Sequence, residues 1–317
     1  MDIVVIQMLS FDAYDDLTLP PYLWYNGSPN AERDNMRTEI QPLFKWTGSK
    51  QRMLDAYHNR FYPSSDFPRF VDLFAGGLTN TIQVHEMYPN VELVINDFNS
   101  ELIQMYNDLA SYEHEVVATW ELCVATWLDL PVAERKAYYY RLRDTYTLDY
   151  PHTKHTILSG LLLFMLMVNF NGMWKTYIKC NHRYSTPPGT CTQGESFFEK
   201  KRINIPKVAS MLRSATILNK DFRDVPLLDG DFVYADPPYR DSVVDYQGGF
   251  TEADQIDLSR MLEAHNGPYA YSNKDIGDGY YDMHMPLGTK HIVPATYTAG
   301  RGTSTIQVTE VLISRPS

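Results

Sequence analysis

The tetrapeptide Asp236-Pro237-Pro238-Tyr239 places a carboxylate, a stiff backbone and an aromatic ring side by side. The Asp236 carboxylate and the Pro237 carbonyl can both accept hydrogen bonds, and the Tyr239 ring can stack on a flat ligand. Neither proline has an N–H group to give to a β-sheet, so the backbone forms a rigid corner here. These groups suit a site that holds a planar, amino-bearing ring while its nitrogen attacks an electrophile. For the tetrapeptide alone, the alternative is an ordinary Asp-Pro turn.

A strand is expected directly before this corner. Phe232-Val233-Tyr234-Ala235 is a short apolar run of aromatic and β-branched residues, which indicates a buried strand. Open α/β sheets bind their ligands at the carboxyl ends of their strands. The corner is therefore expected at a ligand-binding edge of a sheet.

A second set of residues has the spacing of a nucleoside site. Phe70 to Phe74 is predicted to form a strand, and the Ala75-Gly76-Gly77 that follows lets a ligand approach the backbone closely. Asp97 closes the next predicted strand, 21 residues after Gly76, at the spacing of a carboxylate that binds ribose hydroxyls. The sequence has no GxxxxGK[ST] motif for a triphosphate. A nucleoside ligand beside an amine-holding site indicates S-adenosylmethionine as the cofactor.

The periodicity of the chain predicts alternating strands and helices, the pattern of a doubly wound, mostly parallel sheet. Strands are expected at residues 70–74, 91–96, 215–218, 232–235, 269–273 and 305–314. Helices are expected from about Thr79, after Ser100, and from Thr251, where Thr-Glu-Ala-Asp is a capping-box pattern. The predicted fold class is therefore α/β and Rossmann-like.

Residues 112–214 interrupt this alternation, mainly with helices. The stretch to Arg143 is rich in Trp, Tyr and Leu, and Ile157 to Val168 is apolar nearly all round, which is typical of a buried helix. The rest of the insertion is expected to be basic and rich in loops. The chain is accordingly divided into an N-terminal extension of unknown role (1–40), a catalytic domain (41–111 and 215–317) and an inserted, mainly helical recognition domain (112–214).

The net charge of −11 is unusual for a nucleic-acid binder, but the charges are unevenly distributed. Residues 1–40 hold seven acidic and two basic residues, whereas residues 175–223 hold ten Lys or Arg and three acidic residues. Tyr, His and Asn are interleaved with these bases. The basic block is a candidate surface for nucleic-acid phosphates, and a solvated loop with a chance excess of charge is the alternative.

Composition argues against several other classes of protein. The longest apolar run, Leu161 to Val168, has 8 residues, against the ~18 that span a bilayer, and we find no signal peptide. The three cysteines cannot all pair, which favours a reducing compartment. Cys180, His182 and Cys191 lack a fourth ligand and a known zinc spacing, so no metal is expected.

With these motifs in place, residues 43 to 316 resemble the Dam-like (class alpha) family of S-adenosylmethionine-dependent adenine-N6 DNA methyltransferases. The similar segments are Phe44 to Lys50 (the family's "KWxGxK" motif), Phe70 to Gly77 (its glycine loop), Ile95 to Asn99 (its ribose motif), Asn169 to Gly172 (the start of its target-recognition hairpin), Asp221-Phe222 (the segment lining the cofactor adenine), Asp236 to Tyr239 (its catalytic DPPY) and Ser272 to Asp275 (its later "SNHD"). Their order, with the recognition insertion before the catalytic motif, is the most specific point of the resemblance.

The resemblance implies a class I methyltransferase fold and roles for individual residues. The implied catalytic residues are Asp236, Pro237, Pro238 and Tyr239. The implied cofactor contacts are Trp46, Lys50, Phe74, Ala75, Gly76, Asp97, Asp221, Phe222 and Asp236. The implied DNA contacts are Lys45, Phe170, Asn171, Met173, Lys175, Lys179, Arg183 and Tyr184. Asn171 is expected at a base edge, and the lysines and the arginine of the hairpin are expected at phosphates.

Three residues depart from the family pattern. Leu78 stands at the last glycine of the usual FxGxG loop, so the loop is expected to bend differently. Lys175 stands where members that read GATC have an arginine, and a lysine cannot form the same bidentate contact with guanine. Thr305 stands where an arginine often precedes the final glutamate.

The implied reaction is methyl transfer from S-adenosylmethionine to an adenine that is flipped out of double-stranded DNA, with no metal. The expected protein is cytoplasmic, in a bacterial or phage-infected cell, and a monomer or weak dimer with no membrane contact. Two alternatives are a methyltransferase of another amine (an RNA base or a glutamine side chain) and a catalytically weak DNA-binding protein on the same fold. The sequence leaves open the recognition site and the presence of a restriction partner.

Overall fold

The computed structural model describes residues 39–48, 50, 67–240, 249–298 and 305–315. Nearly all of the predicted N-terminal extension (1–40) lies outside the described residues, as does the segment 51–66 after Lys50, where the sequence indicates a further helix. The described residues belong to one compact unit.

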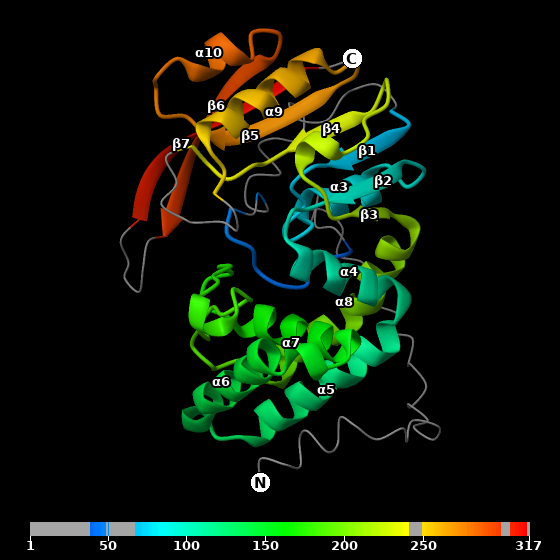
Figure 1. Ribbon diagram of the computed structural model, residues 1–317, viewed down its shortest axis with the longest axis vertical. Coiled ribbons are helices and arrows are strands. Elements are labelled where there is room, and N and C mark those ends of the chain that lie inside the picture. Colours follow the sequence, from blue (N-terminus) through cyan, green and yellow to red (C-terminus); the bar gives the residue numbers. More distant parts are fainter. Residues whose placement is uncertain (1–38, 49, 51–66, 241–248, 299–304, 316–317) are drawn as a thin grey trace, which may run out of the picture. The chain divides into compact units, whose positions relative to one another are not determined.

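Seven strands of the described chain form one sheet in the order β3-β2-β1-β4-β5-β7-β6 (Figure 1). They are β1 (Arg69–Asp72), β2 (Glu92–Asn96), β3 (Thr216–Leu218), β4 (Phe232–Ala235), β5 (Tyr269–Lys274), β6 (Thr289–Thr298) and β7 (Thr305–Arg315). The neighbours from β3 to β5 are parallel, whereas β7 runs antiparallel to both β5 and β6. This confirms the predicted doubly wound, mostly parallel α/β fold.

Helices cover both faces of the sheet (Figure 1). The helices of the described chain are α3 (Thr79–Met87), α4 (Ser100–Ser111), α5 (Glu113–Asp129), α6 (Val132–Leu148), α7 (His155–Val168), α8 (Glu195–Ser214), α9 (Glu252–Ala264) and α10 (Tyr280–His284), with single 3₁₀ turns η2 (Tyr150–His152), η3 (Ile178–Cys180) and η4 (Phe222–Asp224). None of them, within the described part of the chain, is long and apolar enough to cross a membrane. Helices α5, α6 and α7 lie away from the sheet, in the insertion (Figure 1).

The central strand β4 supplies both hydrophobic cores, because successive side chains of a strand point to opposite faces. Phe232 and Tyr234 pack into the core that holds α3, α4 and the helices of the insertion. Val233 and Ala235 pack into a second core with α9 and α10. All four side chains are buried, as a strand covered on both faces requires.

The insertion is built around α7, which is buried along nearly its whole length. Helix α7 packs against α4, α5 and α6, and α4 also packs against α8, so α4 joins the sheet to the insertion. The predicted boundaries of the insertion coincide with the ends of α4 at Ser111 and of α8 at Ser214. The division into a catalytic and a recognition domain stays a prediction.

Several elements differ from the prediction. Strand β6 and helix α10 were not predicted. Residues 195–214, expected to belong to a loop-rich block, form helix α8 instead. Its buried residues Phe198, Ile205, Val208 and Leu212 have helical spacing, and their burial outweighs the loss of one backbone hydrogen bond at Pro206.

The glycine loop also differs from the prediction at Leu78. This residue adopts φ 64° and ψ 18°, the left-handed conformation that glycine favours, and caps the start of α3. The loop therefore keeps the course that a glycine would give it, and the strain falls on the leucine. The Leu78 side chain is buried in the core with Ile82, so burial offsets a strain of about 1–2 kcal/mol.

Two substitutions at Leu78 separate the stabilisation by burial of the side chain from the cost of the strained backbone. Leu78→Ala removes the buried side chain but keeps the strained backbone, so we expect a loss of about 3 kcal/mol in the free energy of unfolding. Leu78→Gly removes both, so it should be the more stable of the two by about 1 kcal/mol. Urea unfolding of both variants measures the difference. A glycine variant that is less stable than the alanine variant, as is usual elsewhere, would contradict the strained conformation.

Candidate active site and recognition hairpin

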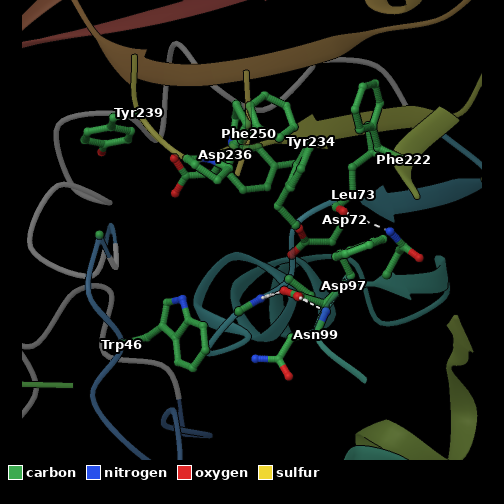
Figure 2. A pocket seen from close by; sticks show the side chains of 18 of the residues that line it. Trp46, Asp72, Leu73, Asp97, Asn99, Phe222, Tyr234, Asp236, Tyr239 and Phe250 are labelled. Carbon is green, nitrogen blue, oxygen red and sulfur yellow. Dashed lines mark hydrogen bonds between the residues drawn. The ribbon is translucent and has the colours of Figure 1, made fainter. Parts of the chain in front are cut away.

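A cavity of about 510 Å³ lies at the carboxyl ends of β1, β2, β3 and β4 (Figure 2). This volume is in the range of small-molecule sites. Every residue predicted to be catalytic or to contact the cofactor lines it: Trp46, Lys50, Phe74, Ala75, Gly76, Asp97, Asp221, Phe222, Asp236, Pro237, Pro238 and Tyr239. The fold thus gathers into one cavity residues that the sequence distributes over five separate segments.

Trp46 closes one side of the cavity by packing on the glycine loop. A Cβ atom on Gly76 would lie 2.5 Å from Trp46 Nε1, and one on Gly77 would lie 2.8 Å from Trp46 Cβ. Gly76 also has a positive φ of 44°. Any larger residue would displace the indole, so the two glycines are needed for this contact.

Asp97 is fixed at the bottom of the cavity by backbone amides. Its Oδ2 atom accepts a hydrogen bond from the Gly76 N–H, and its Oδ1 atom accepts one from the Asn99 N–H, both at 2.9 Å (Figure 2). Burial raises the pKa of the Asp97 carboxyl, against the effect of these two donors. A carboxylate has about four acceptor sites, so the remaining ones can accept hydroxyl donors from a ligand.

Asp72, at the end of β1, is a cavity residue that the sequence analysis did not identify. Its side chain is 1% exposed, and its Oδ2 atom accepts a hydrogen bond of 2.7 Å from Thr81. Its Oδ1 atom has no hydrogen-bond partner within the described part of the chain. Burial, with help from the charges of Asp236 and Asp97, raises the pKa of Asp72 to about 7. A cationic donor from a ligand would satisfy this oxygen.

Three phenylalanine rings form an apolar wall of the cavity. Phe74, Phe222 and Phe250 have centroids 5.7–5.8 Å apart, and all three line the cavity (Figure 2). Such a wall can pack against the face of a flat aromatic ligand.

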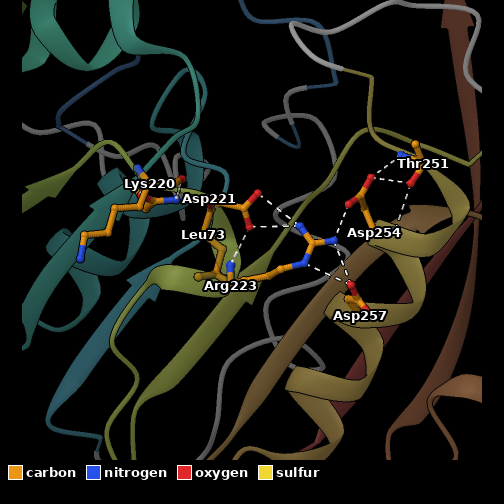
Figure 3. A network of polar contacts seen from close by, with 8 residues as sticks. Leu73, Lys220, Asp221, Arg223, Thr251, Asp254 and Asp257 are labelled. Atoms are coloured by element: carbon orange, nitrogen blue, oxygen red, sulfur yellow. Dashed lines mark hydrogen bonds and ion pairs between the residues drawn. The ribbon is translucent and has the colours of Figure 1, made fainter.

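Arg223 holds the segment that carries Phe222 in place. Its guanidinium lies between Asp221 on one side and Asp254 and Asp257, from the first turns of α9, on the other (Figure 3). The hydrogen bond with Asp254 contributes most to raising the pKa of Arg223. Asp221, which was predicted to contact the cofactor, lines the cavity but is already paired with this arginine.

The Asp236 carboxylate is held from two sides. Lys50 Nζ lies 2.9 Å from both of its oxygens, and Ser272 Oγ donates to Oδ1 at 2.8 Å. Lys50 is only 2% exposed and also donates to the Gly48 carbonyl at 3.0 Å. The pair joins the loop after Trp46 to the proline corner after β4.

Tyr239 is fixed through its hydroxyl group. The hydroxyl accepts a hydrogen bond from Lys50 and donates one of 2.9 Å to Glu310 of β7. Burial raises the pKa of this hydroxyl, so it stays a neutral donor. Glu310 is itself fully buried, and no local motif indicated its role.

Residues 169–189 form the predicted hairpin, with antiparallel bridges between Asn169 and Pro188 and between Thr176 and Tyr184. The base of the hairpin is a tight turn in which Asn169 Oδ1 accepts the Gly172 N–H at 3.0 Å. The Gly172 carbonyl then accepts the Thr47 N–H at 3.0 Å. The hairpin is therefore bonded directly to the loop that carries Trp46.

The predicted DNA contacts fall into two groups. Lys45, Asn171, Lys175 and Lys179 are exposed, and Phe170 and Met173 are partly exposed, so all six are accessible to a partner.

Two predicted DNA contacts are instead structural. Tyr184 is fully buried, and its hydroxyl bonds with Asn169 and Tyr139. The Arg183 guanidinium is stacked between Tyr146 and Tyr150, at 4.5 and 3.8 Å from their ring centroids. Arg183 also forms an ion pair with Glu101 of α4, with 3.6 Å between Nη2 and Oε2. The interleaving of bases with aromatic residues, which favoured DNA contact, here reflects internal packing.

Comparison with known proteins adds to this geometry. Residues 46–281 match the family described as D12 class N6 adenine-specific DNA methyltransferase. The chain is 23% identical to the type II methyltransferase M.MjaIII of Methanocaldococcus jannaschii, over 80% of this chain and 91% of that protein. It is 24% identical to the type II methyltransferase M1.LlaDCHI of Lactococcus lactis subsp. cremoris, over 88% and 96% respectively. It is also 26% identical to the retron Ec67 DNA adenine methylase of Escherichia coli, over 74% and 78%.

The raised pKa of Asp72 predicts a pH-dependent stability. Unfolding returns this carboxyl to an ordinary pKa near 4, so between about pH 4 and pH 7 the unfolded chain loses a proton that the folded chain keeps. The contribution of Asp72 to the free energy of unfolding therefore falls as pH rises through this window and levels off above pH 7.

Asp72→Asn cannot ionise, so it should gain stability relative to the wild type by about 2–4 kcal/mol between pH 4.5 and pH 8. Urea unfolding at several pH values measures this difference. Asp229→Asn, at an exposed loop position, is the control and should follow the wild type. Parallel pH profiles for wild type and Asp72→Asn would show that Asp72 ionises normally.

Proposed function

Because the chain belongs to the D12 class N6 adenine-specific DNA methyltransferase family, it is an adenine-specific DNA methyltransferase, and we propose that it transfers the methyl group of S-adenosylmethionine to an adenine flipped out of duplex DNA. The proposed cofactor and the proposed flipped adenine rest on one observation. The nucleoside-type features around Asp97 and the Asp236 corner line a single cavity. A methyl donor and a target amine can therefore meet in it.

The residues of the cavity fit S-adenosylmethionine. Asp97 has acceptor sites left for two ribose hydroxyls, and the wall of Phe74, Phe222 and Phe250 suits the adenine ring. The unsatisfied Oδ1 atom of Asp72 suits the positively charged amino group of the methionyl part. When bound, S-adenosylmethionine supplies a methyl group that its positively charged sulfur makes electrophilic.

The proline corner activates the target nitrogen. The lone pair of the adenine amino group is delocalised into the ring, which makes it a weak nucleophile. The Asp236 carboxylate and the Pro237 carbonyl each accept one of its N–H bonds, which draws the nitrogen towards tetrahedral geometry and localises the lone pair. The nitrogen–methyl bond forms as the sulfur–methyl bond breaks, and the nitrogen then gives up one proton to solvent.

Lys50 and Ser272 leave Asp236 one acceptor site for this task. They use three of the roughly four acceptor sites of the carboxylate: one on each oxygen for Lys50, and a second on Oδ1 for Ser272. The remaining site is on Oδ2 and can receive the target N–H. The lysine also offsets the desolvation of the carboxylate and orients it.

The adenine must leave the duplex to reach Asp236, at a cost of a few kcal/mol in stacking and pairing. Stacking of the Tyr239 ring on the flipped base offsets part of this cost, because the ring is held in place through its hydroxyl group. The exposed lysines of the hairpin, Lys175 and Lys179, contact phosphates, and Asn171 at its base reaches a base edge.

The first test removes the acceptor. Asp236→Asn keeps the shape of the side chain but places an N–H₂ group near the target amine, so we expect the single-turnover rate of adenine methylation to fall at least ~10²-fold. S-adenosylmethionine binding, measured by calorimetry, should remain detectable. Asp229→Asn is the matched control and should retain the wild-type rate. A rate for Asp236→Asn within about threefold of wild type would refute the role of this carboxylate.

The second test concerns the DNA surface. Lys179→Gln and Lys175→Gln should each reduce the slope of log affinity against log salt by about 0.9, the value for one phosphate contact. Arg202→Gln is the control. The Arg202 guanidinium already donates to Glu121, from Nε to Oε1 at 2.6 Å and from Nη2 to Oε2 at 2.9 Å, so this substitution should leave the slope unchanged. Unaltered slopes for both lysine variants would remove the hairpin from the phosphate contacts.

A further inference from the structure

The proline corner offers few backbone groups by which the protein can hold it. Pro237 and Pro238 have no N–H, so beyond the carbonyl oxygens the first available donors are the N–H groups of Tyr239 and Arg240. Two of these few groups are engaged by side chains. The Pro238 carbonyl accepts a hydrogen bond of 2.7 Å from Gln255 of α9, and the Arg240 N–H donates one of 3.0 Å to Asn273 of β5.

A third side chain joins these two. The Tyr271 hydroxyl donates to Gln255 Oε1 at 3.1 Å and accepts from Asn273 Nδ2 at 2.8 Å. Gln255 is 2% exposed, and Tyr271 and Asn273 are fully buried. These three residues, hereafter the buried clamp, form one continuous chain of hydrogen bonds from the residue before Tyr239 to the residue after it.

The two ends of the clamp determine which atoms donate and which accept in each of its hydrogen bonds. The Pro238 carbonyl can only accept, so Gln255 must present its amide N–H₂ there and its oxygen to Tyr271. The Arg240 N–H can only donate, so Asn273 must present its oxygen there and its N–H₂ to Tyr271. Every member then has its partner, and no other arrangement of the two amides satisfies both ends.

Burial makes this arrangement stiff. A buried polar group that loses its partner costs more than an exposed one, so the clamp resists any shift of the Pro238–Arg240 backbone. None of the three side chains lines the cavity. They act on the reaction only through the position of the corner.

We propose, on the basis of the function proposed above, that the buried clamp sets the position of Asp236 and the Pro237 carbonyl for methyl transfer, which makes Gln255, Tyr271 and Asn273 positioning residues of the reaction. A displacement of about 1 Å in a reacting group can cost ~10²-fold in rate. The clamp therefore controls the rate of transfer rather than the affinity for either ligand.

The first experiment compares two tyrosines of β5. Tyr271→Phe breaks the middle of the clamp. Tyr269→Phe, two residues away on the same face of the strand, removes the hydroxyl of another buried tyrosine, and this hydroxyl bonds to Glu263 rather than to a member of the clamp. We expect both variants to lower the urea midpoint of unfolding by similar amounts. Only Tyr271→Phe should lower the single-turnover methylation rate, by about 10-fold to 100-fold.

Calorimetric affinity for S-adenosylmethionine and the affinity for duplex DNA should stay within about twofold of wild type in both variants. Equal methylation rates for the two variants would overturn the proposal. A wild-type enzyme that methylates no adenine would instead contradict the proposed function itself, so the two failures are distinguishable.

The second experiment tests whether residue 255 must donate a hydrogen bond to the Pro238 carbonyl. Gln255→Glu places a carboxylate against the Pro238 carbonyl, so two acceptors face each other until the buried carboxyl takes up a proton. Its rate relative to wild type should therefore rise several-fold as the pH is lowered from 8 to 6. Gln255→Met, which cannot donate at any pH, should show a low and constant ratio. A flat ratio for Gln255→Glu, or a wild-type rate for Gln255→Met, would show that the clamp does not position the corner.

Discussion

The site depends on the placement of one carboxylate, that of Asp236, between Lys50 and Ser272. A charge in this partly buried position is costly unless it is paired, and here Lys50 pairs with both oxygens at 2.9 Å. The parallel sheet sets where the carboxylate lies, because β4 ends at Ala235 and the prolines prevent the strand from continuing. The loop that supplies Lys50 also supplies Trp46, so the same ion pair holds the loop whose indole packs on Gly76 and Gly77.

The recognition hairpin and the active site are mechanically connected. The Gly172 carbonyl at the base of the hairpin accepts hydrogen bonds from both the N–H and the hydroxyl of Thr47, at 3.0 and 3.1 Å. Thr47 lies between Trp46, which packs on the glycine loop, and Lys50, which holds Asp236. These two hydrogen bonds therefore join the hairpin directly to the loop that holds Asp236.

The sequence predicted the parts of the site that are carried by local patterns. The strand at 232–235, the proline corner and Asp97 were identified because short apolar runs and fixed spacings depend on neighbours in the chain. Asp72 was missed because a single acidic residue in a strand gives no sign of its burial. The buried clamp was missed for a related reason, since its three residues come from two separate elements and meet only in the folded chain.

The errors have a common physical cause. The basic block with its interleaved aromatic residues, together with the family resemblance, suggested that Arg183 and Tyr184 face DNA, but composition does not distinguish a solvated cation from one stacked between tyrosines. The basic block suggested loops at residues 195–214, but the burial of one helical face favours a helix there in spite of Pro206. Leu78 suggested a different loop course, but the side chain gains enough by burial to accept a strained φ.

The central claim is that the Asp236 corner presents the amino group of a flipped adenine to a methyl donor in the adjoining cavity. The most direct measurement is nucleoside mass spectrometry of duplex DNA after incubation with the protein and isotopically labelled S-adenosylmethionine. The account predicts that all of the transferred label appears in N6-methyldeoxyadenosine. Label in a methylated cytosine, or no label in the DNA at all, would contradict it.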